Sequence, residues 1–200
     1  MILRRPGILT VVVFTLILAL SGCESPEERA EQHFQAGMEL LEAGDPDRAL
    51  VEFRNVFKLD GQHREARLAY AEIQRDRGQL SEAYGQYLRL VEQYPDDVEG
   101  RRALGELAIL LGDWAETDRH GRAAKLLAAD DPLIIAMNTL LDYHAALESD
   151  DAAAEERAVD VARGVLAGDA TQMMARRVVI DQMLRKERWQ DALAEVDAHP

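Results

Sequence analysis

A 34-residue period runs through the first half of this chain, and it constrains the fold more than any other sequence feature. Two columns of small residues carry the period most clearly: Gly44, Gly78 and Gly112, and Gly37, Ala71 and Gly105. A period of this length indicates a repeated supersecondary unit that buries its apolar face by stacking on its neighbours. Each unit reads as two amphipathic helices joined by a short turn at the glycine. The sequence therefore predicts an all-α fold.

The recurring residues occupy positions at which two antiparallel helices pack against each other. Small residues let the helix axes approach, and larger residues one turn away fill the groove between them. The pattern resembles the tetratricopeptide repeat (TPR) family, which implies an α-solenoid with three regular repeats at residues 30–63, 64–97 and 98–131. The repeat-defining packing residues that it implies are Gly37, Ala49, Phe53, Ala71, Ala83, Tyr87, Pro95 and Gly105. In the third repeat, Thr117 and Gly121 replace the small and aromatic residues, so its second helix is expected to pack more loosely.

Beyond Asp131 the spacing of the small positions lengthens from 34 to 41 residues, measured from Thr117 to Ala158. Seven additional residues make about two turns of α-helix, so one more turn in each helix preserves the packing face. We therefore expect two irregular TPR-like helix pairs in residues 132–200, which gives about five pairs in all. Their helices are predicted at residues 133–148, 152–167, 171–186 and 189–198. Because apolar residues remain near its end, the array is expected to continue beyond the chain or to dock onto another surface.

The first 22 residues have the parts of a signal peptide: a short cationic start, an apolar run and small residues before Cys23. The sequence LSGC at residues 20–23 resembles the lipobox of bacterial lipoproteins. That resemblance implies cleavage after Gly22 and diacylglycerol on the Cys23 sulfur, with palmitate as an expected acyl chain. Residues 23–29 would then be a lipidated N-terminus and short tether, and Glu24 favours the outer membrane. The alternatives are an ordinary cleavable signal with an incidental cysteine, and a buried core helix.

Charge excludes nucleic acid from the expected partners. The formal net charge of −14 becomes −16 once residues 1–22 are removed, because that segment carries two arginines and no acid. Such a surface repels phosphate backbones. The acids are interleaved with Arg and Lys, which is typical of solvated helix faces.

The sequence contains no recognisable pattern for catalysis or metal binding. No two of the five histidines lie three to five residues apart, so the spacings of zinc-binding helices do not occur. The sequence contains neither a GxSxG motif nor a glycine-rich loop that could bind phosphate. We place His120 and His144 on the surface or in the groove, and we interpret Trp114 and Trp189 as core-packing residues. The paired acids before the predicted helices are interpreted as helix caps. We therefore expect no enzyme activity, no metal and no cofactor other than a covalent lipid on Cys23.

In TPR proteins the first helix of each pair lines a concave groove, and the resemblance assigns the groove residues by register. The side chains that it implies are Phe34, Met38, Leu41, Leu68, Glu72, Arg75, Arg102, Glu106 and Ile109. An apolar patch in the first repeat and mixed charges in the next two suit an extended or helical peptide. The lysine and asparagine clamp of chaperone-binding TPR proteins is missing, because Phe34, Met38, Leu68 and Glu72 stand at those positions. An alternative is that Phe34 and Met38 pack against the N-terminal tether.

These features predict a membrane-anchored periplasmic scaffold that binds partner peptides or helices for envelope assembly or secretion. TPR lipoproteins of similar plan are known in outer-membrane barrel assembly, in type IV pilus biogenesis and beside exosortase and exopolysaccharide clusters, and the mature N-terminus is most similar to the last group. The expected partners are such envelope proteins and, through the lipid, the membrane. An alternative is the N-terminal TPR portion of a longer envelope enzyme or of a secretion or polysaccharide-export component. A glycan-binding module is a third hypothesis, and the aromatic content of 6% counts against it.

Overall fold

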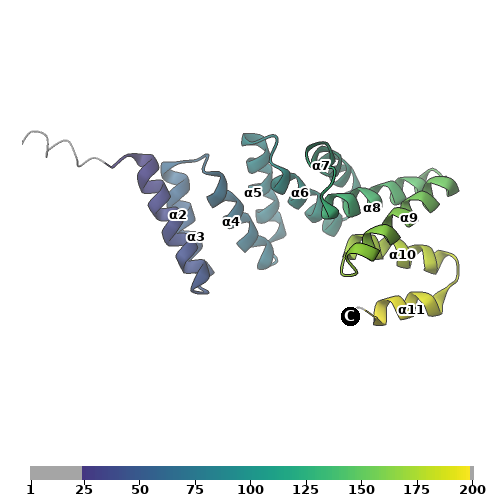
Figure 1. Cartoon of the computed structure of the whole chain (residues 1–200). Coiled ribbons are helices and arrows are strands. Elements are labelled where there is room, and N and C mark those ends of the chain that lie inside the picture. The colour runs from purple at the N-terminus through teal and green to yellow at the C-terminus, as the bar shows by residue number, and fades with distance from the viewer. Residues whose placement is uncertain (1–23, 199–200) are drawn as a thin grey trace, which may run out of the picture. The chain divides into compact units, whose positions relative to one another are not determined.

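The computed structural model describes residues 24–198, and in this range the chain forms ten α-helices and no strand (Figure 1). The predicted signal peptide, residues 1–22, and Cys23 lie outside the described residues. The helices are α2 (Pro26–Glu42), α3 (Pro46–Leu59), α4 (Arg64–Asp76), α5 (Leu80–Gln93), α6 (Val98–Leu111), α7 (Trp114–Leu127), α8 (Pro132–Glu148), α9 (Ala152–Gly168), α10 (Met173–Arg185) and α11 (Trp189–Asp197). The predicted all-α class is confirmed for this range.

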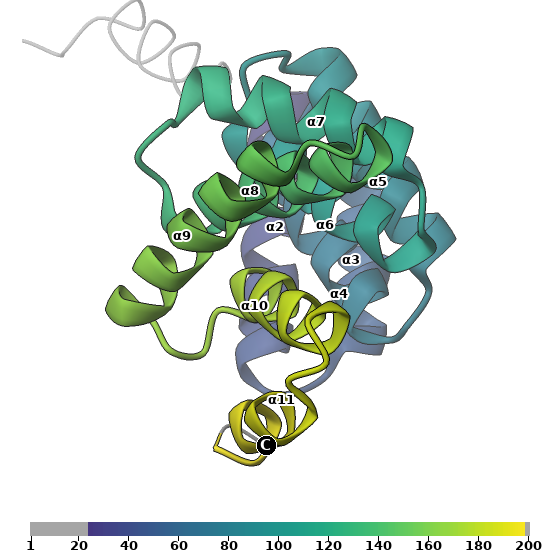
Figure 2. The ribbon, with the colours of Figure 1, turned by 90° about the vertical axis from the view of Figure 1, so that its right-hand side faces the viewer.

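The helices group into two compact units, with the boundary between Ala66 and Arg67 near the start of α4. The first unit contains α2 and α3, and the second contains most of α4 together with α5 to α11. Within the second unit, α8 and α9 lie side by side and α10 packs against both (Figure 2).

Polar side chains explain where most of the helices begin. Seven N-cap residues accept a hydrogen bond from a backbone N–H of the first turn: Ser25, Asp45, Asp97, Asp113, Asp131, Asp151 and Gln172. Each bond satisfies a donor that the helix itself leaves unpaired. The interpretation of the paired acids as caps is confirmed at Asp97, Asp131 and Asp151. The predicted tether is shorter than expected, because Ser25 and Glu28 form a capping box that starts α2 at Pro26.

The glycine column of the period marks the turn inside each of the first three pairs. Gly44, Gly78 and Gly112 have φ values of +75°, +71° and +73°, which is the left-handed region that ends a helix. Asp150 and Glu187 take the same conformation in the last two pairs, with φ values of 53° and 59°. Because a side chain makes this conformation costly, glycine recurs where the repeat is regular.

Close approach at small residues holds the helix pair of the first unit together. A Cβ atom added to Gly37 of α2 would lie 2.5 Å from Cε1 of Phe53 on α3, so only glycine fits under the ring. Phe53 and Ala49 have no exposed surface.

Seven of the eight predicted packing residues are buried, and Pro95 is the exposed exception. The Pro95 carbonyl instead accepts hydrogen bonds from Nε and Nη2 of Arg101, both at 3.2 Å.

The expected loose packing of the third repeat is wrong, because a residue from the next repeat fills the space. Met137 of α8 is fully buried, and its sulfur lies where a side chain on Gly105 would have to be. The same side chain packs beside Gly121, where an added Cβ would also lie 2.9 Å from Cδ1 of Leu141. The missing aromatic ring of the third repeat is thus replaced by methionine and leucine from α8.

The helices beyond Asp131 lie within two residues of their predicted ends. Both α8 and α9 contain 17 residues, whereas α6 and α7 contain 14 each. The additional residues therefore lengthen the two helices of this pair, as expected. Each helix gains almost one turn, which keeps the packing face in register.

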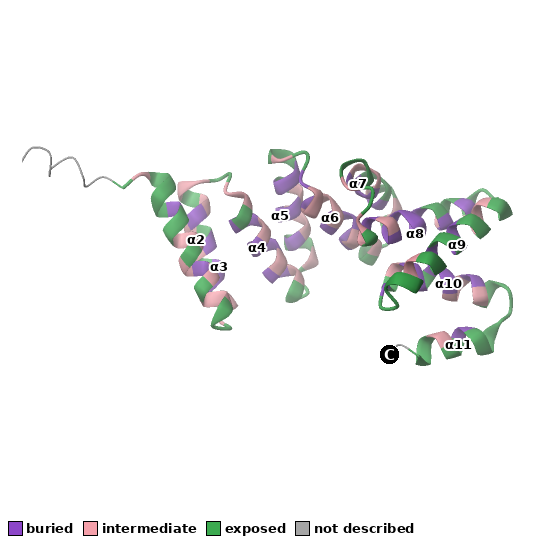
Figure 3. Cartoon of the chain, in the orientation of Figure 1, coloured by how far each residue is buried: buried purple, intermediate pink, exposed green. Residues whose placement is uncertain are grey.

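Two side chains lie in environments opposite to those predicted. His120 is fully buried, with Nε2 3.2 Å from Oε2 of Glu116, and burial lowers the pKa of its imidazole although Glu116 opposes the shift. Trp189 is 61% exposed on α11, which is exposed over most of its surface (Figure 3). Trp114 does pack against a hydrophobic core cluster. Both errors concern burial by neighbouring helices. The sequence pattern of a single helix does not show which of its residues a neighbouring helix covers.

We predict that Gly112→Ala lowers the free energy of unfolding by about 1 kcal/mol, because alanine must adopt the left-handed conformation. No atom obstructs a Cβ at this position, so the cost is conformational and not steric. Gly164→Ala is the matched control, since Gly164 lies inside α9 with open space around it. There alanine should stabilise the helix by up to about 1 kcal/mol. Urea denaturation measures both values, and a shift of the same sign in the two variants would contradict the explanation.

Candidate functional site

An apolar groove of about 550 Å³ lies between α6, α8 and α10 in the second unit. We call it the α6–α8–α10 groove, and its apolar lining consists of Ile109, Leu110, Leu140, Met173, Met174, Ile180 and Leu184. Leu110 and Met173 are 69% and 70% exposed, so large apolar side chains face solvent here. Exposed apolar surface that is concentrated in a groove is typical of a binding site for another apolar surface.

The groove exists because α10 is apolar on two faces. Ala175, Val178 and Val179 are buried in the core of the second unit. Met173, Ile180 and Leu184 follow each other at intervals of seven and four residues, which places them together on the opposite side of the helix. The core therefore fixes α10 through one face and leaves the other face available.

A smaller cavity adjoins the groove, shares Leu140, Arg177 and Asp181 with it, and carries aromatic and charged side chains. The rings of Trp114 and His144 stack with their centroids 3.9 Å apart, and the Arg177 guanidinium lies 5.6 Å from the Trp114 ring centroid. The Tyr143 hydroxyl donates a 2.7 Å hydrogen bond to Oδ2 of Asp181. Burial, followed by this contact with the carboxylate, raises the pKa of Tyr143 well above its ordinary value, so the hydroxyl stays protonated as a donor. The adjoining cavity can orient a ligand, while the apolar lining of the groove supplies contact area.

The predicted groove residues of the first unit are half-buried. The Phe34 ring lies 4.8 Å from the His63 ring and 6.1 Å from the Phe53 ring, between centroids. Phe34 thus contacts residues of its own repeat. Met38 and Leu41 are also half-buried, so the three side chains have partly exposed surface.

Four of the predicted residues in the second unit form a charged cluster. Glu106 lies between Arg75 and Arg102, at 4.0 Å and 3.9 Å from their nearest nitrogen atoms. Burial raises the pKa of the Glu106 carboxyl although both arginines oppose it. Burial likewise raises the pKa of Glu72, with Arg75 opposing the shift most strongly. Leu68 packs against a core cluster, and of the nine predicted residues only Ile109 lines the α6–α8–α10 groove.

Sequence reasoning missed the groove residues contributed by α8 and α10. The prediction followed the register of the three regular repeats, and that register ends before α8 begins. The available signal was the second apolar stripe of α10, formed by Met173, Ile180 and Leu184. One apolar stripe is enough to pack a helix against the core. A second apolar stripe on the opposite face indicates a second binding surface.

Within residues 24–198, no three His, Cys, Asp or Glu side chains converge in a way that would hold a metal ion. In the same range, no helix combines the length and the apolar character that crossing a membrane requires.

We predict that Glu106 makes the folded state less stable as the pH rises from about 4.5 towards neutrality. Its folded pKa is raised, so the stabilising protonated form is fully present below the unfolded pKa of 4.5 and is lost as the pH rises through the folded pKa. Glu106→Gln should remove this contribution. The difference in unfolding free energy, wild type minus variant, should therefore fall with increasing pH in urea denaturation curves. A difference that stays constant between pH 4 and pH 7.5 would show that the carboxyl is not perturbed.

Comparison with known proteins agrees with the helix-pair architecture. The family model "Tetratricopeptide repeat" matches residues 40–107. The fold is similar to that of YrrB, described as "a TPR protein with an unusual peptide-binding site", at 15% identity and a TM-score of 0.64, covering 92% of this chain and 89% of YrrB. It is also similar to MamA from Desulfovibrio magneticus RS-1, at 13% identity and a TM-score of 0.65, covering 86% of this chain and 93% of MamA.

A third similar structure is PilF of Pseudomonas aeruginosa, at 15% identity and a TM-score of 0.59, covering 86% of this chain and 75% of PilF. Among the curated proteins none matches the sequence of this chain. At such identities the structural similarities establish the fold. Residues 40–107 carry the tetratricopeptide repeat signature, and the described helices share the fold of known TPR proteins.

Proposed function

We propose that this chain is a scaffold that binds an apolar segment of a partner protein in the α6–α8–α10 groove. The observation that carries the proposal is the exposure of Leu110 and Met173, at 69% and 70%, on the rim of an apolar groove. Covering these side chains removes apolar surface from water, which is the main favourable term in protein association. The fold supports the same class of function, because TPR proteins commonly bind other proteins or peptides.

The groove favours a segment that presents several apolar side chains along one face, such as an amphipathic helix. Ile180 and Leu184 continue the apolar lining beyond Met173 along α10, and Ile109 and Leu140 face them from α6 and α8. A surface built from parallel ridges of helices accepts a helix or an extended strand through anchors at regular spacing. Arg177 and Asp181, which the groove shares with the adjoining cavity, add polar contacts that set the direction of the bound segment.

The double variant Leu110→Gln with Met173→Gln is expected to weaken partner capture by roughly tenfold, since apolar anchors dominate such interfaces. The double variant Leu111→Gln with Leu126→Gln is the matched control. Those two leucines are 56% and 88% exposed and lie outside the groove, so the same chemistry is changed on other surfaces. Crosslinking in the producing bacterium, followed by pull-down and mass spectrometry, measures the captured proteins. If both double variants capture the same amount of partner, the groove is not the binding site.

The scaffold is further proposed to be a lipoprotein that acts in the bacterial cell envelope. Residues 20–23 carry the lipobox-like sequence LSGC after a cationic start and an apolar run, and this supports lipid attachment at Cys23. In this proposal the lipid holds the array at the periplasmic face of the outer membrane, where it binds partners in envelope assembly or secretion. The net charge of −16 after removal of residues 1–22 supports partners other than nucleic acid.

Palmitate labelling in growing cells tests the anchor. The wild-type protein should incorporate the label and fractionate with membranes, and Cys23→Ser should lose both properties, because this cysteine is the only one in the chain. Persistent labelling of Cys23→Ser would refute lipidation at this residue.

A further inference from the structure

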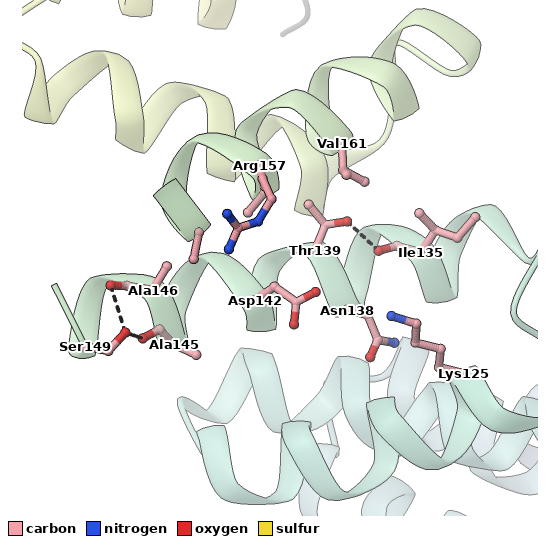
Figure 4. Close-up of a pocket in the computed structure, with 12 residues that line it drawn as sticks. Lys125, Ile135, Asn138, Thr139, Asp142, Ala145, Ala146, Ser149, Arg157 and Val161 are labelled. Carbon is pink, nitrogen blue, oxygen red and sulfur yellow. Dashed lines mark hydrogen bonds between the residues drawn. The ribbon is translucent and has the colours of Figure 1, made fainter. Parts of the chain in front are cut away.

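A second hollow of about 490 Å³ lies on the other side of α8 from the groove, between α7 and α9 (Figure 4). We call it the α7–α9 pocket. Its floor consists of α8 residues such as Ile135, Thr139 and Asp142, whereas the groove uses Leu140 and the adjoining cavity His144. At 100° per residue these two sets face opposite sides of the helix. The two sites can therefore be occupied and altered independently.

The polar groups on the floor of the pocket already have hydrogen-bond or ion-pair partners within the protein. The Thr139 hydroxyl donates to the Ile135 carbonyl at 2.8 Å. The Asn138 amide donates to the carbonyls of Gly121 and Ile134, at 3.0 Å and 2.9 Å. Alanines and the half-exposed Ile135 and Val161 supply apolar surface around them. A ligand therefore meets a preformed surface with few polar groups that need a new partner.

Charge distinguishes this pocket from the rest of the acidic chain. The carboxylate of Asp142 is already paired with Arg122, whose Nη2 lies 2.8 Å from Oδ1. Lys125 from α7 and Arg157 from α9 also line the pocket, on either side of the α8 residues (Figure 4). Within residues 24–198 neither makes an ion pair or a side-chain hydrogen bond, whereas the neighbouring Arg163 is paired with Asp160. The pocket thus presents two cations that form no ion pair with an acid of the described chain.

The dimensions favour a peptide segment over a compact small molecule. The lining residues extend from Ile135 on α8 to its C-cap Ser149, a distance of roughly 20 Å at 1.5 Å per residue. A volume of about 490 Å³ spread over that length is a shallow trough. An extended chain of about six residues covers the same length, at about 3.3 Å per residue.

We propose that the α7–α9 pocket binds an acidic, extended segment of a partner protein, whose carboxylates pair with Lys125 and Arg157. The apolar atoms between the acidic side chains rest on Ile135, Val161 and the alanines. Binding forms two new ion pairs and breaks none, because the two cations have no partner acid in the described part of the chain. This is a site in addition to the proposed groove, and it does not depend on the groove being occupied.

A fluorescein-labelled peptide of alternating Glu and Ala, six residues long, is the probe, and the same peptide with Gln in place of Glu is its control. In fluorescence anisotropy titrations of the purified protein, Lys125→Gln and Arg157→Gln should each weaken binding of the Glu peptide by roughly two- to fivefold, as expected for solvent-accessible ion pairs. Arg89→Gln is the matched control, because Arg89 is exposed on α5 of the same unit and likewise makes no ion pair among residues 24–198. It should leave the affinity unchanged.

A filling variant tests the hollow itself. Ala145→Leu places a larger side chain in the trough at an exposed helical position and changes no charge, so it should also weaken the Glu peptide. The groove variant Leu110→Gln with Met173→Gln should bind the peptide as the wild type does, which separates this site from the proposed function. Equal affinity for the Glu and Gln peptides, or an equal loss in Arg89→Gln, would overturn the proposal. Loss of binding in the groove variant but not in Arg157→Gln would do the same.

Discussion

The close approach of helices at residues without side chains is the constraint on which the rest of this molecule depends. In the first unit the Phe53 ring occupies the space that a side chain on Gly37 would need. In the second unit Met137 fills the corresponding space beside both Gly105 and Gly121. Each contact fixes the distance between neighbouring helices, and overfilling such a contact costs about 1–3 kcal/mol. The surfaces between helices keep their shape because these distances cannot relax without breaking the packing.

Helix α8 connects the packed core to both proposed binding surfaces. Nine of its 17 residues are buried, and two opposite sides of the helix line separate cavities. One side forms the floor of the α7–α9 pocket and the other contributes to the α6–α8–α10 groove. The additional turn in α8 and α9 adds surface to this pair, since Ser149 and Ala154 near the turn line the pocket. Part of the pocket therefore lies at the end of the lengthened pair.

The repeat itself, its helix starts and its packing residues were predictable, because they depend on residues close together in the sequence. An aspartate before a proline or a glycine every 34 residues fixes the local backbone. The groove was predictable only at Ile109, since it depends on which face of α10 the core leaves uncovered. Met137 replacing the missing ring at Gly121, and the burial of His120, depend on contacts between repeats. Such contacts follow from three-dimensional packing that the 34-residue pattern does not encode.

The sulfur of Met137 gives the second unit a chemical vulnerability. While α6, α7 and α8 remain packed, the thioether is sealed against Gly105 and no oxidant reaches it. A transient separation of these helices would expose it, and conversion to the sulfoxide would add a polar oxygen for which the glycine contact leaves no space. The helices then could not close again until a reductase restored the thioether. One oxygen atom would thus turn a brief opening into a lasting one.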